Sequence, residues 1–223
     1  MSFKKDFVWG SATASYQIEG AAFEDGKGWN IWDVFTHEGG HVYGNHTGDV
    51  ACDHYHRFKE DIKLMKELGM KAYRFSVNWA RIMPTGEGAV NEKGIAFYNE
   101  LIDELLANGI EPYLTLYHWE LPYDLYKQGG FLNPKIADWF YDYASVIAER
   151  FSDRVKHFFT LNEPQCIIGL GYLSGEQAPG LKTGKKDIFQ MIYNLLRAHG
   201  KCVSALREKS VQPVKIGLAS CGN

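Results

Sequence analysis

The sequence has few of the features that mark disulfide-rich, membrane or secreted proteins. Its 223 residues include four cysteines, and none of them forms a Cys-x-x-Cys pair, so reduced and buried thiols are the simplest interpretation. No apolar run approaches the ~18 residues that a membrane-spanning helix needs. Residues 1–6 contain no hydrophobic signal core. These absences predict a cytoplasmic protein without a membrane partner.

Clusters of positive charge and metal-binding motifs are scarce as well. The formal net charge is −3 and the pI is about 6.2, with no basic stripe, so we expect no nucleic-acid partner. His54 with His56, and His37 with His41, are patterns too weak to define a metal site. The glycine pairs fit no phosphate-binding loop. The sequence therefore predicts neither a metal nor a cofactor.

Aromatic residues, in contrast, are abundant. Six Trp, 13 Tyr and 13 Phe accompany a hydrophobic content of 45%, which suffices for one sizeable core. Two interpretations of these rings are compatible with each other. Most of them fill the core, and some offer flat apolar faces on which the C–H faces of sugar rings stack.

Strand and helix patterns alternate along the chain. Five segments are typical of strands, namely 7–10, 71–77, 111–117, 156–161 and 214–219. Four amphipathic helices are expected between them: one capped by Asp53 and ending at Gly69, one from Asn91 to Gly109, one from Asn133 to about Phe151, and one from Asp187 with Ile188, Met191, Ile192, Leu195 and Leu196 on one side. This order predicts a parallel sheet with helices outside it.

The fold class that follows is α/β, a TIM (β/α)₈ barrel truncated to about five βα units. A closed barrel needs eight units and about 250 residues. Long connections after the first, third and fourth strands take up much of this sequence instead. No linker or low-complexity segment interrupts it. We therefore expect residues 1–223 to form a single domain that corresponds to the front part of a barrel.

The fourth predicted strand ends in a chemically informative segment, Thr160-Leu161-Asn162-Glu163-Pro164. In a β/α barrel the catalytic groups come from the carboxyl ends of the strands. A glutamate at such an end, beside an asparagine that can orient a sugar, has the features of a glycosidase acid/base residue. The alternative is a solvated loop carboxylate, and the position by itself leaves both open.

Six short motifs occur in a specific order along the chain. They are residues 7–21 (FVWGSATASYQIEGA), 29–33 (WNIWD), 73–76 (YRFS), 117–122 (YHWELP), 161–164 (LNEP), and Gly171-Tyr172 with Gly175 and Ala178-Pro179-Gly180. Each alone is weak. Together they resemble glycoside hydrolase family 1, the β-glucosidase family, over essentially the whole sequence.

This resemblance implies a retaining glycosidase on a TIM barrel, with an acid/base Glu after the fourth strand and a nucleophile Glu after the seventh. Glu163 follows the fourth strand of the independent count, so it is the expected acid/base residue. Retention needs two carboxyl groups about 5–5.5 Å apart. The family's nucleophile motif, an Ile- or Val-Thr-Glu-Asn-Gly run, occurs nowhere in the sequence. Glu120 stands where the family usually has Asp.

The resemblance also implies which residues bind substrate. Gln17, His118 and Asn162 match the family's contacts to sugar hydroxyls. Amide and imidazole groups suit this role because each offers both a donor and an acceptor. Trp119 occupies a position where family members that act on 6-phosphorylated glucosides tend to carry Phe, so it supports a non-phosphorylated β-glucoside substrate.

Arg74 matches the residue that orients the nucleophile carboxylate in the family. A guanidinium inside an apolar strand requires an anionic partner. Because the nucleophile motif is missing, we expect Arg74 to be either exposed on an open sheet or paired with a substitute such as Glu163.

Three hypotheses about function remain open at this point. The chain supplies the acid/base Glu of a retaining β-glucosidase and has little activity alone. Alternatively, it is an inactive half-barrel that forms a homo-oligomer, or pairs with a complementary C-terminal fragment, through its open sheet edges. In the third case its parent is a 6-phospho-β-glucosidase.

Overall fold

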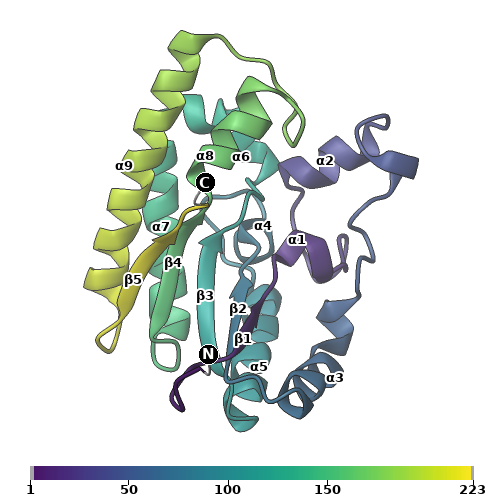
Figure 1. Cartoon of the computed structure of the whole chain (residues 1–223). Helices are drawn as coiled ribbons and strands as arrows, with labels where there is room; N and C mark the ends of the chain where they lie inside the picture. Colours follow the sequence, from purple (N-terminus) through teal and green to yellow (C-terminus); the bar gives the residue numbers. More distant parts are fainter. Residues whose placement is uncertain (1–2, 222–223) are drawn as a thin grey trace.

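Five parallel strands form one sheet, and their spatial order is the same as their order in the sequence. The computed structural model describes residues 3–221 (Figure 1). The strands are β1 (Gly10–Ala12), β2 (Ala72–Ser76), β3 (Glu111–Tyr117), β4 (His157–Asn162) and β5 (Lys215–Ala219). Because all of them run in parallel, their carboxyl ends meet at one edge of the sheet.

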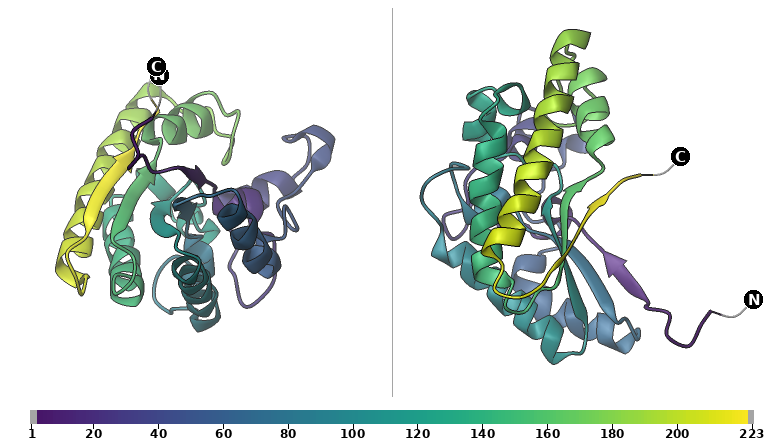
Figure 2. Two further views of the ribbon diagram at one scale, coloured as in Figure 1. Left: turned by 60° about the horizontal axis from the view of Figure 1, so that its bottom comes forward. Right: turned by 90° about the vertical axis from the view of Figure 1, so that its left-hand side faces the viewer.

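Four long helices connect successive strands. They are α3 (His54–Glu67), α5 (Glu92–Ala107), α7 (Ile136–Phe151) and α9 (Lys185–Lys209). The left view of Figure 2 shows them around the outside of a curved sheet whose inner side they leave uncovered. This arrangement confirms the expected α/β class. It also confirms the expected truncated barrel of about five βα units. None of the helices within residues 3–221 is long and apolar enough to cross a bilayer.

Several predicted boundaries and caps are corrected. The first strand lies at β1, two to three residues later than predicted, and α7 starts at Ile136 rather than at the Asn133-Pro134 pair. Asp53 precedes α3 but has a left-handed backbone with φ 55°, and its carboxylate pairs with the His56 ring instead of capping the helix. Asn91 likewise donates to the carbonyls of Asp25 and Arg81 rather than capping α5.

Short helical segments fill the connections that follow the strands. They are α1 (Ser15–Ile18), α2 (Ile31–His37), η1 (Tyr43–Asn45), α4 (Trp79–Ile82), α6 (Tyr123–Lys127), η2 (Gly130–Leu132), α8 (Pro164–Ile168) and η3 (Gly169–Leu173). Helix α2 begins with a capping box, in which Asn30 accepts from the Asp33 backbone N–H and Asp33 accepts from that of Asn30. These loop helices are what surrounds the carboxyl edge of the sheet.

The core lies between the sheet and the long helices. Buried residues of α5, α7 and α9 pack together with Leu114, Leu116 and Phe158 of the sheet. Helix α9 buries a narrower face than predicted, because Ile192 and Leu196 are 37% and 57% exposed. The outer side of α9 therefore exposes some apolar side chains to solvent.

A buried ion pair fixes the connection after β1 to the rest of the core. Arg81 Nε lies 3.1 Å from Glu19 Oε2, and both side chains are almost fully buried. Tyr98 donates to the other Glu19 oxygen, and the guanidinium lies 4.3 Å from the centre of the Tyr55 ring. A buried ion pair is maintained only when such additional contacts satisfy its charges. This pair anchors the segment that carries Gln17.

Candidate active site at the carboxyl ends of the strands

Three neighbouring strands bring polar side chains to one place at the carboxyl edge. Arg74 lies on β2, His118 and Trp119 directly follow β3, and Asn162 is the last residue of β4, followed by Glu163. Pairing of β2 with β3 and of β3 with β4 places these positions side by side. The sequence motifs around them are far apart along the chain, so the sheet itself creates the cluster.

Asn162 is the central residue of a hydrogen-bonded chain. Its Oδ1 accepts from Arg74 Nη2 at 2.7 Å, and its Nδ2 lies 3.1 Å from His118 Nε2. A guanidinium can only donate, so the atom facing it must be the amide oxygen. The amide nitrogen therefore donates to His118 Nε2, which leaves the proton of the neutral ring on Nδ1. The order of donation runs from Arg74 through Asn162 to His118.

His118 is neutral at physiological pH. Burial, together with the nearby Arg74 charge, lowers the pKa of His118 to about 4. Its Nδ1 atom is buried and has no hydrogen-bond partner among residues 3–221. A buried donor without a partner is unfavourable, so this N–H group is suited to a ligand oxygen.

Arg74 does not occupy either of the two predicted environments. It is half-buried, and no carboxylate in the described chain forms an ion pair with it. Instead its Nε donates to Thr115 Oγ1 at 2.8 Å, its guanidinium lies 4.9 Å from the centre of the Phe159 ring, and Asn162 takes the remaining contact. Burial lowers the pKa of Arg74, and the charge of Glu163 opposes that effect. Neutral oxygens and a ring face replace the expected anion.

Trp119 is held in an unusual conformation. Its φ is 85°, a left-handed value that is rare outside glycine. Its indole Nε1 donates to the Asn162 carbonyl at 2.9 Å. This bond fixes the ring next to the end of β4. Strained backbone of this kind is found preferentially at functional sites.

Glu163 also has a left-handed backbone, with φ 46° and ψ 64°. Its N–H donates to Ala219 O of β5 at 2.6 Å, and its carbonyl accepts from Cys166 N in the first turn of α8. Its side chain is half-buried and makes no hydrogen bond within the described residues. The carboxyl group is thus held by its backbone at the carboxyl edge of the sheet, and its oxygens are free to meet a ligand.

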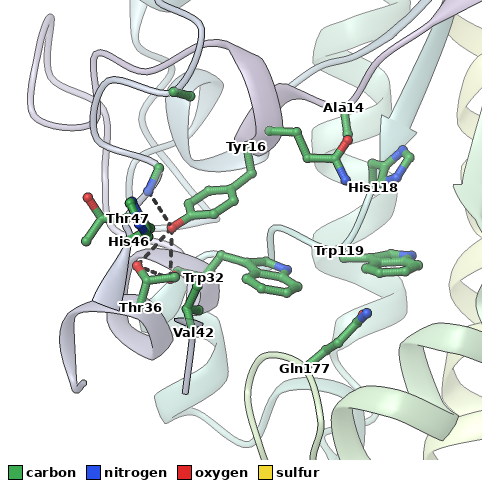
Figure 3. A pocket seen from close by; sticks show the side chains of 13 residues that line it. Ala14, Tyr16, Trp32, Thr36, Val42, His46, Thr47, His118, Trp119 and Gln177 are labelled. Carbon is green, nitrogen blue, oxygen red and sulfur yellow. Dashed lines mark hydrogen bonds between the residues drawn. The ribbon is translucent and has the colours of Figure 1, made fainter. Parts of the chain in front are cut away.

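A pocket of about 370 Å³ opens beside this cluster. Gln17, His118 and Trp119 line it, but Asn162 and Glu163 do not. Figure 3 shows Tyr16 and Trp32 on one side of this pocket and His118 and Trp119 on the other. The predicted site residues therefore fall into two groups, one that lines the pocket and one at the end of β4. His118 and Trp119 belong to the first group and connect it to the second through their hydrogen bonds with Asn162.

The sequence indicated Glu120 only as a departure from the Asp that is usual in the family, and its structural role was missed. This carboxyl group is fully buried and accepts from Ser15 Oγ, from Tyr16 N at 3.3 Å and from His118 N at 3.2 Å. Burial raises the pKa of Glu120 to about 7. Glu120 joins α1, which carries Gln17, to the turn that carries His118. An acidic residue directly between Trp119 and Leu121 was the signal in the sequence.

Comparison with known proteins agrees with these observations. The profile of glycosyl hydrolase family 1 matches residues 1–222. A 1,4-beta-D-glucan glucohydrolase of Thermotoga neapolitana is 52% identical over 219 residues, covering 97% of this chain and 50% of that protein. Beta-glucosidase A of Acetivibrio thermocellus is 51% identical, with 98% and 48% covered. An aryl-phospho-beta-D-glucosidase, BglC, of Bacillus subtilis is 49% identical over 208 residues, with 93% and 43% covered.

Solved structures give the same result. A beta-glucosidase from Thermotoga maritima in complex with glucoimidazole superimposes with a TM-score of 0.94 at 51% identity, covering 97% of this chain and 49% of that one. The chain thus spans about half the length of the relatives it matches. A profile match over nearly every residue, with the strand-end cluster described above, shows that the chain belongs to glycosyl hydrolase family 1.

Proposed function

We propose that this chain contributes the acid/base half of a retaining β-glucosidase site, with Glu163 as the acid/base residue. In the first step Glu163 protonates the glycosidic oxygen while a second carboxylate attacks the anomeric carbon. In the second step Glu163 removes a proton from the water that releases the sugar. The attacking carboxylate is proposed to come from outside this sequence, which contains no nucleophile motif of the family.

The observation that carries the proposal is the hydrogen-bonded chain beside Glu163. Arg74 polarises the Asn162 amide, and the amide holds a neutral His118 in one tautomer. A neutral ring with a free Nδ1–H can donate to a sugar hydroxyl, and Gln17 offers both a donor and an acceptor in the same pocket. We propose that Gln17, His118 and Asn162 bind the glycone hydroxyls.

The proposed substrate is a non-phosphorylated β-glucoside. Trp119 supports this choice, and two of the relatives are named for glucan or glucoside hydrolysis. A 6-phospho-β-glucoside is the second candidate, because BglC is nearly as similar as those relatives. Hydrolysis rates of p-nitrophenyl β-glucoside and its 6-phosphate, measured with the same preparation, decide between them.

The test of Glu163 uses aryl β-glucosides with good and poor leaving groups. We expect the chain alone to show little turnover, and a mixture with the C-terminal half of a family member to be active. In that mixture Glu163→Gln lowers kcat/KM, which reports the first step, by about 10²–10⁴-fold for a poor leaving group, and much less for a dinitrophenolate that needs no protonation. Glu176→Gln, an exposed glutamate in the following loop, is the matched control and leaves kcat unchanged.

One outcome would contradict the role of Glu163, and another would contradict the proposal that the chain contains only half of the site. Full activity of the Glu163→Gln mixture on the poor leaving group removes Glu163 from the acid/base role. Turnover by the chain alone that Glu163→Gln abolishes shows that the chain contains a complete site.

Assembly through open surfaces is a second candidate function, and two observations favour it. The outer face of α9 exposes Phe189, Tyr193 and Leu196 by 57–70%. Every residue of the edge strand β5 is at least partly exposed. Surfaces of this kind favour association with another chain. A homo-oligomer or a pair with a complementary fragment would bury them.

We also propose a cytoplasmic location. The support is that all four cysteines are free thiols, as is usual in a reducing compartment. Fractionation of the source cells with an antibody to the chain tests it, and recovery outside the cytoplasmic fraction contradicts it.

A further inference from the structure

Two cysteines that are 55 positions apart in the sequence meet beside the strand-end cluster. Cys166 lies in α8 and Cys221 follows β5, and their sulfur atoms are 3.6 Å apart. A disulfide has a sulfur–sulfur distance of about 2.05 Å. The two sulfurs must therefore approach each other by about 1.5 Å to form the bond.

The backbone on both sides of this pair is anchored. Asn162 and Ala219 are register partners of β4 and β5, and Glu163 N donates to Ala219 O. Gln165 Nε2 donates to the Cys221 carbonyl at 2.8 Å and contacts its sulfur at 3.0 Å. The sheet and the first turn of α8 thus hold the two sulfurs together independently of any bond between them.

The environments of the other two cysteines differ from those of Cys166 and Cys221. Cys202 is completely buried in α9, where burial strongly raises the pKa of its thiol. Cys52 is exposed in the loop before α3. Neither is in sulfur contact with a second cysteine in the part of the chain that the structure describes. Cys166 and Cys221 are therefore the pair that is positioned for intramolecular oxidation.

We propose that Cys166 and Cys221 form a reversible disulfide that responds to peroxide and fixes α8 to the end of β5. The chemistry balances in two steps. The Cys221 thiolate attacks a peroxide oxygen, breaks the O–O bond and becomes a sulfenic acid, with release of one water after protonation. The Cys166 sulfur then attacks the Cys221 sulfur and displaces the hydroxyl group as a second water. Two thiols are oxidised, and one hydrogen peroxide is reduced to two waters.

The surroundings of the two sulfurs indicate which of them reacts first with peroxide. Burial raises the pKa of Cys166 to about 11, and the neighbouring Cys221 and Glu163 act in the same direction. Cys166 is therefore a neutral thiol at physiological pH, and a neutral thiol is a poor nucleophile toward peroxide. Gln165 Nε2 lies 3.0 Å from Cys221 Sγ, where its N–H group can donate to a Cys221 thiolate. We therefore assign Cys221 as the sulfur that reacts with the oxidant and Cys166 as the sulfur that resolves the sulfenic acid. A dithiol reductant restores both thiols by exchange.

The disulfide has a consequence for the proposed acid/base residue. Cys166 N donates to Glu163 O at 2.9 Å, so a covalent bond from Cys166 to the end of β5 restrains the turn that carries Glu163. This consequence rests on the proposed function of Glu163, whereas formation of the disulfide does not. The two claims can therefore fail separately.

The first experiment treats the folded chain with a small excess of hydrogen peroxide and maps its cysteines by mass spectrometry without reduction. We expect loss of two hydrogen atoms, a single Cys166–Cys221 crosslinked peptide, and full reversal by dithiothreitol. The bond should form about tenfold faster in the folded chain than in guanidinium chloride, because the sheet holds the sulfurs together. Mixed pairings, or Cys166 and Cys221 recovered as separate sulfinic acids, would overturn the proposal.

Matched variants separate this bond from general oxidation. Cys221→Ser and Cys166→Ser each abolish the crosslink, while Cys52→Ser leaves its rate unchanged. Circular dichroism checks that each variant is folded. The disulfide closes a long loop, so oxidation should raise Tm of the wild type by roughly 5–10 °C and leave Tm of Cys221→Ser unchanged. An equal Tm rise in both would contradict the proposed restraint.

Activity of the oxidised chain, mixed with a complementary half, is read separately. A change in kcat on oxidation that is absent in Cys221→Ser supports the link to Glu163. An unchanged kcat with a mapped crosslink refutes that link but leaves the disulfide standing.

Discussion

At the scale of single residues, hydrogen-bond chemistry determines the protonation of the strand-end cluster. Arg74 has no acceptor atoms, so it fixes the orientation of the Asn162 amide, which in turn fixes the tautomer of His118. The family resemblance implied that these residues belong to one site. It could not indicate which of them touch, because contact depends on the register of three strands.

The first prediction concerns Asn162→Asp. A carboxylate at this position forms an ion pair with Arg74 and places a negative charge beside His118. The pKa of His118, which is about 4 in the wild type, is then expected to rise. NMR titration of the histidine rings measures it. His199, which bonds Thr160, is the internal control and should titrate as before. An unchanged His118 titration would show that the hydrogen-bonded chain does not form in solution.

The second prediction concerns Glu120 and pH. Its pKa is about 7 in the folded chain and 4.5 in the unfolded chain, so the folded state binds this proton more tightly. The resulting stabilisation is complete below about pH 4.5 and is lost as pH rises to about 7. The hydroxyl group of Ser15 and the backbone N–H groups of Glu120 and Tyr16 favour the charged form of this carboxyl group, but burial is the larger effect.

Denaturant unfolding of wild type and Glu120→Gln across this pH range tests whether the stabilisation by Glu120 falls as the pH rises. Relative to the variant, the wild type should lose about 3 kcal/mol of unfolding free energy between about pH 4.5 and about pH 7. Parallel pH profiles of the two proteins would show that Glu120 does not carry the linkage.

At the scale of elements, packing decides which helical positions tolerate side chains. A Cβ added to Gly94 in α5 would lie 2.1 Å from the Arg81 carbonyl of α4, whereas a Cβ added to Gly200 in α9 would meet nothing within 4 Å. Both glycines lie within helices, and sequence reasoning treats them alike. Only the contact between α4 and α5 distinguishes them.

The third prediction follows from this difference. Gly94→Ala should destabilise the chain by about 1–3 kcal/mol through overpacking. Gly200→Ala should stabilise it by about 0.5–1 kcal/mol, because alanine is the better helix former. Thermal unfolding of the two variants gives opposite shifts in Tm. Shifts of the same sign would contradict the close packing of α4 on α5.

Element prediction from the sequence was best where periodicity was strong. The strand 111–117 and the apolar face of α5 are found as predicted, and the other long elements shift by one to three residues at some ends. The prediction was too broad for α9, because Ile192 and Leu196 continue the apolar stripe on a side that is open to solvent in the described part of the chain. Hydrophobic spacing locates an apolar face but does not reveal whether a partner occupies it.

At the scale of the whole molecule, the surface of α9 leads to the fourth prediction. Replacing Phe189 and Tyr193 with serine removes two exposed rings without touching the buried face. If the exposed face drives association, wild-type chain gains mass with concentration in light scattering and the double variant remains closer to a monomer. Tyr43→Ser, which removes a ring that is 95% exposed elsewhere, is the control. Equal masses for all three proteins would exclude α9 as the interface.

The sequence by itself determined the parallel βα order, the family and the identity of the candidate acid/base residue, because local periodicity and short motifs carry this information. The single-domain assignment of residues 1–223 stays a prediction. Tertiary structure alone decided that neutral oxygens replace an ion pair at Arg74, that Glu120 bridges α1 and the His118 turn, and that Cys166 meets Cys221. Each of these contacts joins distant segments through strand register and burial, which no local pattern records.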